Sequence, residues 1–290
     1  MKFEYFRFLL TPVKEPQLPL HGKIDRDDLI AEIFSKNKTH IFKSRKANYG
    51  ITIDFIKDGV ARGRVGKKTT KKLRSSPEEG FTVKDAEDWP GSTIVINLND
   101  EKETGKLREA GQIIAISVNK SAIQSSKKCL RAFAEKINEE IVNKGFFFTI
   151  NPIPTEKTKF WAIAKKYKGQ IQKVTLTYTP PNILQLGSTL EDDLREDNKV
   201  FNTTKTQVVF ENESGDLDLP EANSFLNQSA DYIDLGGGTY KFNLKNGKTT
   251  LTSENGIKTE TFEGVELSLE ANDEKEIQDA LKLILGVEND

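Results

Sequence analysis

The densest group of side chains that could do chemistry in this sequence is a run of lysines and arginines between positions 36 and 74. This segment holds thirteen Lys and Arg residues against two Asp residues, a net charge of +11. Cations at this density neutralise phosphates and release counterions from a nucleic acid, and flexible lysines can follow its backbone. We therefore expect nucleic-acid contacts from ten residues of the segment: Lys43, Arg45, Lys46, Arg62, Arg64, Lys67, Lys68, Lys71, Lys72 and Arg74.

Aromatic side chains are interleaved with these cations at His40, Phe42 and Tyr49. One interpretation is that they stack on unpaired bases, as aromatic residues do in many single-strand binders. The other is that the aromatics belong to the core, while the lysines form a solvated loop or dock on an acidic part of the chain. The sequence leaves both interpretations open.

An alternation of apolar and polar residues on both sides of Lys57-Asp58-Gly59 predicts a β-hairpin inside the basic segment. A two-residue turn would place Arg62 beside Phe55 on the apolar face. We therefore expect a three-residue loop with Gly59 in the left-handed conformation, which places Arg62 opposite Asp54. An Asp54–Arg62 pair would hold that guanidinium and leave Arg64 free for phosphates.

Residues 67–76 follow this hairpin and have no apolar period and few bulky side chains. This composition is typical of a mobile loop. We expect trypsin to cut there first, because exposed loops are the preferred sites of limited proteolysis.

The charge is divided along the chain. Residues 1–180 hold 34 Lys and Arg against 21 Asp and Glu, whereas residues 181–290 hold 9 against 23. The first part is therefore +13 and the second −14, in a chain whose total is −1. Such a division indicates a front that binds polyanions, two parts that attract each other, or both.

Few residues are suited to metal or covalent chemistry. The single cysteine, Cys129, excludes an internal disulfide and a zinc cluster. We expect it to be a small buried or half-buried helix residue whose replacement by serine changes little. The two histidines, His21 and His40, have no serine or cysteine nucleophile in a recognisable arrangement.

Two other patterns are interpreted as structural. The run Gly236-Gly237-Gly238 lacks the Gly-Lys-Ser/Thr ending of a phosphate loop, so it predicts a turn. Acidic runs such as Glu191-Asp192-Asp193 predict a solvated surface, since no strand carries the carboxylate pattern of a nuclease. We therefore expect no catalytic residue, no metal and no cofactor.

The chain lacks the features of a membrane protein. No stretch approaches the ~20 apolar residues of a membrane span, and Met1–Leu10 carries charges that do not suit a signal peptide. We expect a cytoplasmic protein with no membrane partner.

The pattern of expected elements gives a mixed fold, α+β or mixed α/β. A strand-rich, basic part covers residues 1–120, and an acidic part with alternating helices and strands covers residues 121–290. The second part ends in a β-meander between Thr239 and Leu269 and a helix over Glu274–Leu285, which Asp273 caps and Gly286 ends. The boundary near residue 120 is soft, and a single continuous domain is an alternative.

A set of features in the second part occurs in the order Phe160-Trp161, Val174–Tyr178, Pro181-Asn182, Leu190–Leu194, Val209-Phe210-Glu211-Asn212, Gly215, Leu217, Tyr232 and Gly236-Gly237-Gly238. This set resembles an uncharacterised bacterial family of about this length, whose members open with a strand like Met1–Leu10. The resemblance implies a bacterial source and a role in phage defence, because such proteins tend to be encoded in mobile-element or phage-defence loci. It implies no catalytic residue.

These observations predict a non-enzymatic protein that binds DNA or RNA, with nucleic acid and protein as candidate partners. One alternative is an adaptor or regulatory subunit that binds another protein through its charged faces. A further alternative is a metal-dependent nuclease whose site assembles from scattered carboxylates. A continuous basic groove would favour the first function, a basic patch capped by acidic elements the second, and converging carboxylates the third.

Overall fold

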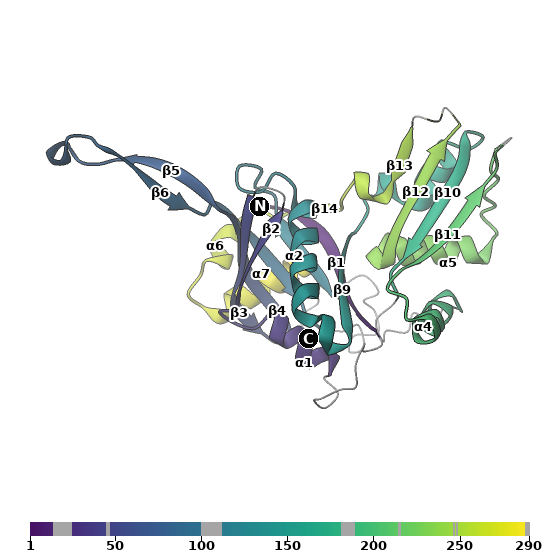
Figure 1. The fold of residues 1–290 in the computed structure, drawn as a ribbon, viewed down its shortest axis with the longest axis horizontal. Helices are drawn as coiled ribbons and strands as arrows, with labels where there is room; N and C mark the ends of the chain where they lie inside the picture. Colours follow the sequence, from purple (N-terminus) through teal and green to yellow (C-terminus); the bar gives the residue numbers. More distant parts are fainter. Residues whose placement is uncertain are drawn as a thin grey trace.

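The computed structural model contains two antiparallel sheets, the helices that pack on them, and one hairpin that projects from the body (Figure 1). The structure describes residues 1–13, 25–44, 47–99, 112–180, 189–213, 216–245, 247 and 249–287. The expected mixed α+β class is confirmed, with strands dominating the first part of the chain.

The large sheet has the strand order β14-β1-β8-β7-β4-β3-β2, and β9 pairs with β1 as well. Strand β8 pairs along one edge of β1, and β14 and β9 follow one another along the other edge. The continuous apolar run of β1 is typical of such a strand, which is covered on both faces. The strands are β1 (Lys2–Pro12), β2 (Thr39–Ser44), β3 (Ala47–Lys57), β4 (Val60–Lys67), β7 (Gly91–Asn97), β8 (Ile113–Ser117), β9 (Phe146–Pro152) and β14 (Thr259–Thr261).

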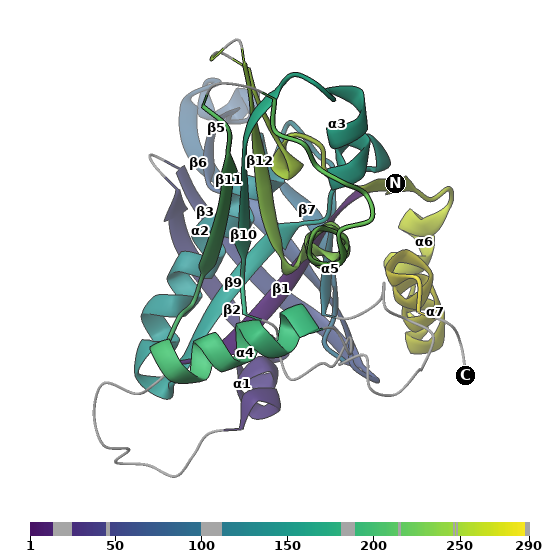
Figure 2. The ribbon, with the colours of Figure 1, turned by 90° about the vertical axis from the view of Figure 1, so that its right-hand side faces the viewer.

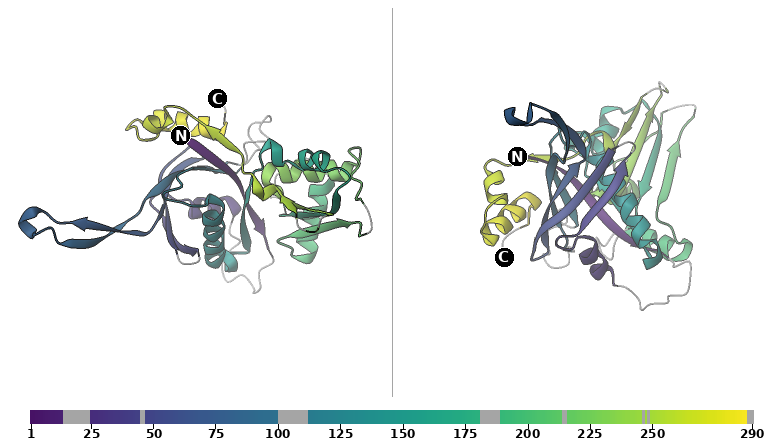
Figure 3. Two further views of the ribbon diagram at one scale, coloured as in Figure 1. Left: turned by 90° about the horizontal axis from the view of Figure 1, so that it is seen from above. Right: turned by 60° about the vertical axis from the view of Figure 1, so that its left-hand side comes forward.

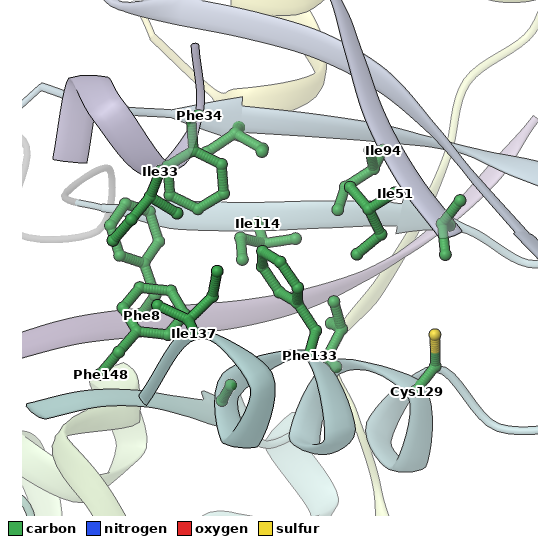
Figure 4. Packing of buried hydrophobic residues seen from close by; sticks show 14 of the residues in the cluster. Phe8, Ile33, Phe34, Ile51, Ile94, Ile114, Cys129, Phe133, Ile137 and Phe148 are labelled. Carbon is green, nitrogen blue, oxygen red and sulfur yellow. The ribbon is translucent and has the colours of Figure 1, made fainter. Parts of the chain in front are cut away.

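The inner face of this curled sheet packs on two helices, α1 (Arg26–Ile33) and α2 (Ser126–Ile141). Helix α2 begins at Ser125, whose side chain accepts a hydrogen bond from the Lys128 backbone N–H. Its apolar stripe includes Phe133, whose ring packs on Phe34 and Phe148 from α1 and β9 (Figure 4). This layer of sheet and helices is the main core.

Cys129 lies in that core rather than at its border. Its side chain is fully buried on α2 and points toward the sheet (Figure 4). Burial raises the pKa of the thiol to about 12, so the thiol is protonated and unreactive. With Cys129 fully buried, a serine hydroxyl would lie among apolar groups, so we now expect a cost from this replacement.

The outer face of the large sheet is partly covered by acidic elements from the end of the chain. Helices α6 (Val265–Leu269) and α7 (Glu274–Leu285) pack on β1, β4 and β7 through a second apolar cluster. Helix α7 has the bounds that the sequence predicts, with Asp273 as its N-cap and Gly286 in the left-handed conformation at its end.

The small sheet has the order β11-β10-β12-β13 and carries its own apolar cluster. Helices α3, α4 and α5 pack around it (Figure 2). Its elements are α3 (Phe160–Lys166), β10 (Ile171–Tyr178), α4 (Thr189–Phe201), β11 (Thr206–Glu211), α5 (Ser224–Tyr232), β12 (Gly238–Leu244) and β13 (Thr250–Thr252). The last strand expected between Thr239 and Leu269, β14, leaves this sheet and pairs with β1 instead.

The predicted loop over residues 67–76 is instead one strand of a hairpin. Strands β5 (Thr69–Arg74) and β6 (Val83–Asp88) pair only with each other and project far from the body (Figures 1 and 3). We call residues 69–88 the arm. Threonines and long charged side chains suit a two-stranded ribbon that is solvated on both faces, which apolar periodicity does not reveal.

The β3–β4 hairpin differs from the expected one at its turn. Lys57 pairs with Val60, so the turn has two residues, Asp58 and Gly59, both with positive φ. The extra residue sits at Asp54, where a bulge shifts the register between Ile53 and Phe55. Beyond the bulge the register is the expected one, while Phe55 turns to the outer face, where it packs with the cluster under α7.

The change from one sheet to the other does not coincide with residue 120. Helix α2 and strands β9 and β14 follow that position and belong to the large sheet and its core, so the chain passes to the small sheet and returns. Within the described ranges, no helix combines the length and the apolar composition that a membrane crossing requires.

Candidate nucleic-acid interface

Two neighbouring rows of side chains cross the uncovered part of the outer face. The register of β2, β3, β4 and β7 aligns Thr39, Thr52, Arg64 and Thr93 in one row and Ile41, Gly50, Gly66 and Gly91 in the next. The three glycines leave a strip of the sheet without side chains, so that a bulky group can approach the backbone.

Trp89 covers part of this glycine strip. A Cβ atom added at Gly50 or Gly66 would lie 3.4 or 3.5 Å from Trp89, so the tryptophan rests directly on both positions. Its indole Nε1–H donates to Glu87 Oε1 at 2.7 Å. Trp89 nevertheless remains 39% exposed. The indole is therefore held in one orientation while keeping a large solvent-exposed area.

Glu87 links this tryptophan to a cation. Its carboxylate accepts the Trp89 hydrogen bond on one oxygen and contacts the Lys68 ammonium with the other. These two partners, Lys68 first, hold the pKa of Glu87 below its ordinary value. The carboxylate thus stays ionised and keeps the indole and the ammonium on the same side of the arm's root.

The two rows and Trp89 line a groove of about 710 Å³. Thr93 and Asn119 contribute polar side chains to it, whereas Ser92 Oγ is buried and Ser117 Oγ accepts the Thr93 backbone N–H at 2.8 Å. Arg64 stands in the groove with its side chain 70% exposed, held only by a 3.4 Å contact with Glu270. We call this feature the Trp89 groove.

The candidate cations extend from the end of the groove out along the arm. Lys43 pairs in register with Asn48, whose carbonyl accepts the backbone N–H of Lys68 at 2.9 Å. Lys67 precedes it, and Lys71, Lys72 and Arg74 follow on β5. Arg45 and Lys46 lie outside the described residues.

These cations differ in their partners. Lys68 pairs with Glu87 and Lys71 pairs with Asp88 at 2.6 Å across the arm. Lys43, Lys67, Lys72 and Arg74 form no ion pair with another residue in the described part of the chain. We call these four the unpaired cations, and they are the side chains most available to phosphates.

Arg62 differs from this group because the protein itself occupies its guanidinium. Its Nε donates to Asp54 Oδ1 at 2.8 Å, which is the pair that the sequence predicts. Its Nη1 donates to the Leu269 carbonyl on α6, and Lys57 lies 3.5 Å from Glu274 on α7. Acidic elements thus cap one half of the basic patch and leave the other half open.

The aromatic residues interleaved with the cations do not reach solvent. His40, Phe42 and Tyr49 are at most 9% exposed and face α2, where burial lowers the pKa of His40. The base-stacking interpretation is therefore wrong for these three residues. The exposed aromatic at this face is Trp89, which sequence reasoning missed because the glycines beneath it are aligned only by the register of the folded sheet.

A second, deeper cleft lies between the two sheets. It has a volume of about 760 Å³ and is lined by Arg7 and Tyr5 of β1, by α3 and α5 residues and by the end of α7. Glu191, expected on a solvated surface, is 1% exposed and lines this cleft. Among the described residues, no three histidine, cysteine or carboxylate side chains are placed to hold a metal ion.

The run Gly236-Gly237-Gly238 lies beside this cleft, between β1 and strand β12 of the small sheet. A Cβ atom at Gly236 would lie 2.7 Å from the Cβ atom of Arg7, and one at Gly237 would lie 2.4 Å from the Tyr232 ring. The run is a turn, as expected, and the absence of side chains lets it pack against β1. Just before it, burial raises the pKa of Asp234 to about 7, although the Phe160 backbone N–H donates to its carboxyl.

Comparisons with known proteins add nothing to this geometry. No protein-family model, curated protein or solved structure matches the chain. The resemblance to a bacterial phage-defence family therefore stays a prediction, and the functional argument comes from the two surfaces described above.

Proposed function

We propose that this protein binds nucleic acid along the arm and its root, without chemical turnover. The observation that carries the proposal is the group of unpaired cations, which extends from an open groove out along the arm. Acidic side chains occupy the other half of the patch, so the free half is the part of the surface on which a polyanion gains most.

The expected binding is electrostatic and depends on salt. Each phosphate that a lysine or arginine neutralises contributes about 0.7 to the slope of log affinity on log salt for a single strand, and about 0.9 for a duplex. Four unpaired cations and Arg64 give a slope of roughly −3.5 to −4.5. Lys68 and Lys71 contribute less, because each would exchange an existing carboxylate partner for a phosphate.

A salt titration with a matched charge control tests the proposal. The variant Lys67→Ala/Lys72→Ala/Arg74→Ala should lose about two to three units of slope and bind all sequences more weakly, because phosphate contacts carry no sequence information. The control Lys157→Ala/Lys168→Ala/Lys241→Ala removes the same charge from exposed positions around the small sheet. The proposal fails if both variants lose affinity equally, or if no nucleic acid binds at low salt.

The adaptor function is a second candidate, and the arm favours it. Its outer part exposes Leu73, Phe81 and Val83, each by more than half. An isolated two-stranded hairpin is only marginally stable in water, so a protein surface that covered these side chains would stabilise it. Replacing all three by threonine should abolish binding of such a partner and leave the salt slope for nucleic acid unchanged.

A role in phage defence follows only from the resemblance described above. It becomes testable once binding is measured, since loss of protection against phage in the Lys67→Ala/Lys72→Ala/Arg74→Ala variant, but not in its charge control, would connect the two.

A further inference from the structure

We propose that the Trp89 groove is a site for an unpaired nucleobase, which makes the ligand a single-stranded DNA or RNA. This inference rests on the proposed nucleic-acid binding and names the strand state that the surface selects. Trp89 would act as a stacking platform, and the neighbouring cations would hold the phosphates on either side of the base.

The contacts that orient Trp89 are made within the protein itself and need no ligand. Gly50 and Gly66 support the indole from below at van der Waals distance, and the Nε1–H bond to Glu87 fixes its rotation. A side chain held from two directions loses little freedom when a base stacks on it, so more of the stacking free energy appears as affinity. An exposed aromatic without such support would give a weaker site.

The arrangement favours a single strand over a duplex. Bases in a duplex are stacked on both faces and offer no free π-face, whereas an unpaired base does. Thr93 and Asn119 also line the groove, and their polar side chains can meet the edge of a base.

The charges around the groove indicate where the phosphate backbone of a bound nucleic-acid strand would lie. Lys43 and Lys68 lie at the arm end of the groove and Arg64 lies within it, whereas Lys67 pairs with Tyr49 and follows the opposite face of the sheet. The two carboxylates at this surface, Glu87 and Glu270, each face a cation of the protein. A phosphate can therefore approach on either side of Trp89.

Fluorescence gives a direct test, because the chain has two tryptophans. In a Trp161→Phe background, Trp89 is the sole tryptophan, and a stacked base should quench its emission. The probes are a 12-mer of thymidylate, a 12-mer of uridylate, a 12-base-pair duplex and an abasic 12-mer with the same phosphates. We expect saturable quenching by the first two and no quenching by the abasic strand; comparable quenching by the duplex would overturn the preference for unpaired strands.

Substitutions separate stacking from charge. Trp89→Ala should weaken binding of the two base-containing single strands by roughly tenfold and leave the abasic strand and the duplex unchanged. Trp89→Phe keeps a ring on the glycines and should recover most of that loss. Phe81→Ala, an exposed aromatic at the tip of the arm, is the matched control and should change nothing.

The outcomes distinguish this inference from the function on which it rests. If single strands bind with the expected salt slope but Trp89→Ala changes no affinity and no quenching occurs, the stacking site is wrong and the phosphate-binding function stands. If none of the four probes binds at low salt, the proposed function fails as well. A melting curve for each variant shows that the fold is intact.

Discussion

The Nε of Arg62 donates to Asp54 Oδ1 at 2.8 Å across the bulge in β3, and the same guanidinium reaches the Leu269 carbonyl. One side chain thus ties the β3–β4 hairpin to α6. Arg64, two residues further along, points into the open groove with one long contact. Two arginines of one strand therefore have different roles.

Arg62→Ala should lower the free energy of unfolding by roughly 1–2 kcal/mol, because it leaves Asp54 and a backbone carbonyl without their charged partner. Its affinity for nucleic acid should stay unchanged. Arg64→Ala should do the reverse, with a normal melting temperature and a salt slope reduced by about one unit. Denaturant unfolding and salt-titrated binding of both variants check this crossed pattern; equal effects of the two substitutions would contradict it.

Cys129→Ser should destabilise the protein by roughly 1–3 kcal/mol, because its hydroxyl would be buried without a partner among apolar side chains. Cys129→Ala removes volume but adds no polar group, so it is the matched control and should cost less than the serine variant. Urea denaturation of both variants gives the comparison. Equal stability of serine variant and parent would mean that this position is not part of the core.

Asp234 should make the protein less stable as the pH rises. Burial raises its folded pKa from 3.8 to about 7, so its proton is held in the folded state and lost in the unfolded state between these values. Its contribution is fully present below pH ~4 and is lost as the pH rises through ~7. Asp234→Asn should therefore match the parent near pH 4 and exceed it at pH 8 by roughly 1–3 kcal/mol.

Thermal melting across pH measures this difference. Asp231→Asn, at an exposed neighbour on α5, controls for the charge that is removed. A constant offset between Asp234→Asn and the parent from pH 4 to pH 8 would show that the effect is not titration of this carboxyl.

The arm should be removable without harm to the body. Thr69 and Asp88 are cross-strand partners, so replacing residues 70–87 with Asn-Gly closes the ribbon in a two-residue turn. The melting temperature should stay within a few degrees of the parent, because the arm pairs only with itself. Limited trypsin should cut the parent first at Lys71, Lys72 or Arg74 and should spare this variant; early cleavage between residues 121 and 180 would contradict the prediction.

Local signals in the sequence predict most elements of the small sheet. In strand β10, Val174, Leu176 and Tyr178 alternate with threonines and Pro180 follows, so a local pattern indicates this strand. Helix α7 also has the predicted bounds, because its cap residues are explicit in the sequence. The arm was missed, since a ribbon without a buried face has no apolar period for a pattern to detect.

The site was predictable in its charges but not in its aromatic group. Lys67, Lys72 and Arg74 are identified by charge density alone. Trp89 could not be assigned, because its role depends on Gly50 and Gly66, which only the register of two other strands brings beneath it. The capture of Arg62 by α6 likewise depends on a contact between residues separated by about 200 positions.

Strand β1 has a consequence for how the chain is made. Its partners are β8, β9 and β14, so the first strand is synthesised long before residues 259–261 complete its edge. At about 5–20 residues per second, roughly 10–50 s pass between the two events. During this time the Lys2–Glu4 end of that edge is unpaired, because β9 pairs only with Phe6–Pro12, and an open strand edge is where nascent chains associate wrongly. Productive folding of this protein therefore depends on residues 259–261 reaching a strand that is synthesised about 250 residues earlier.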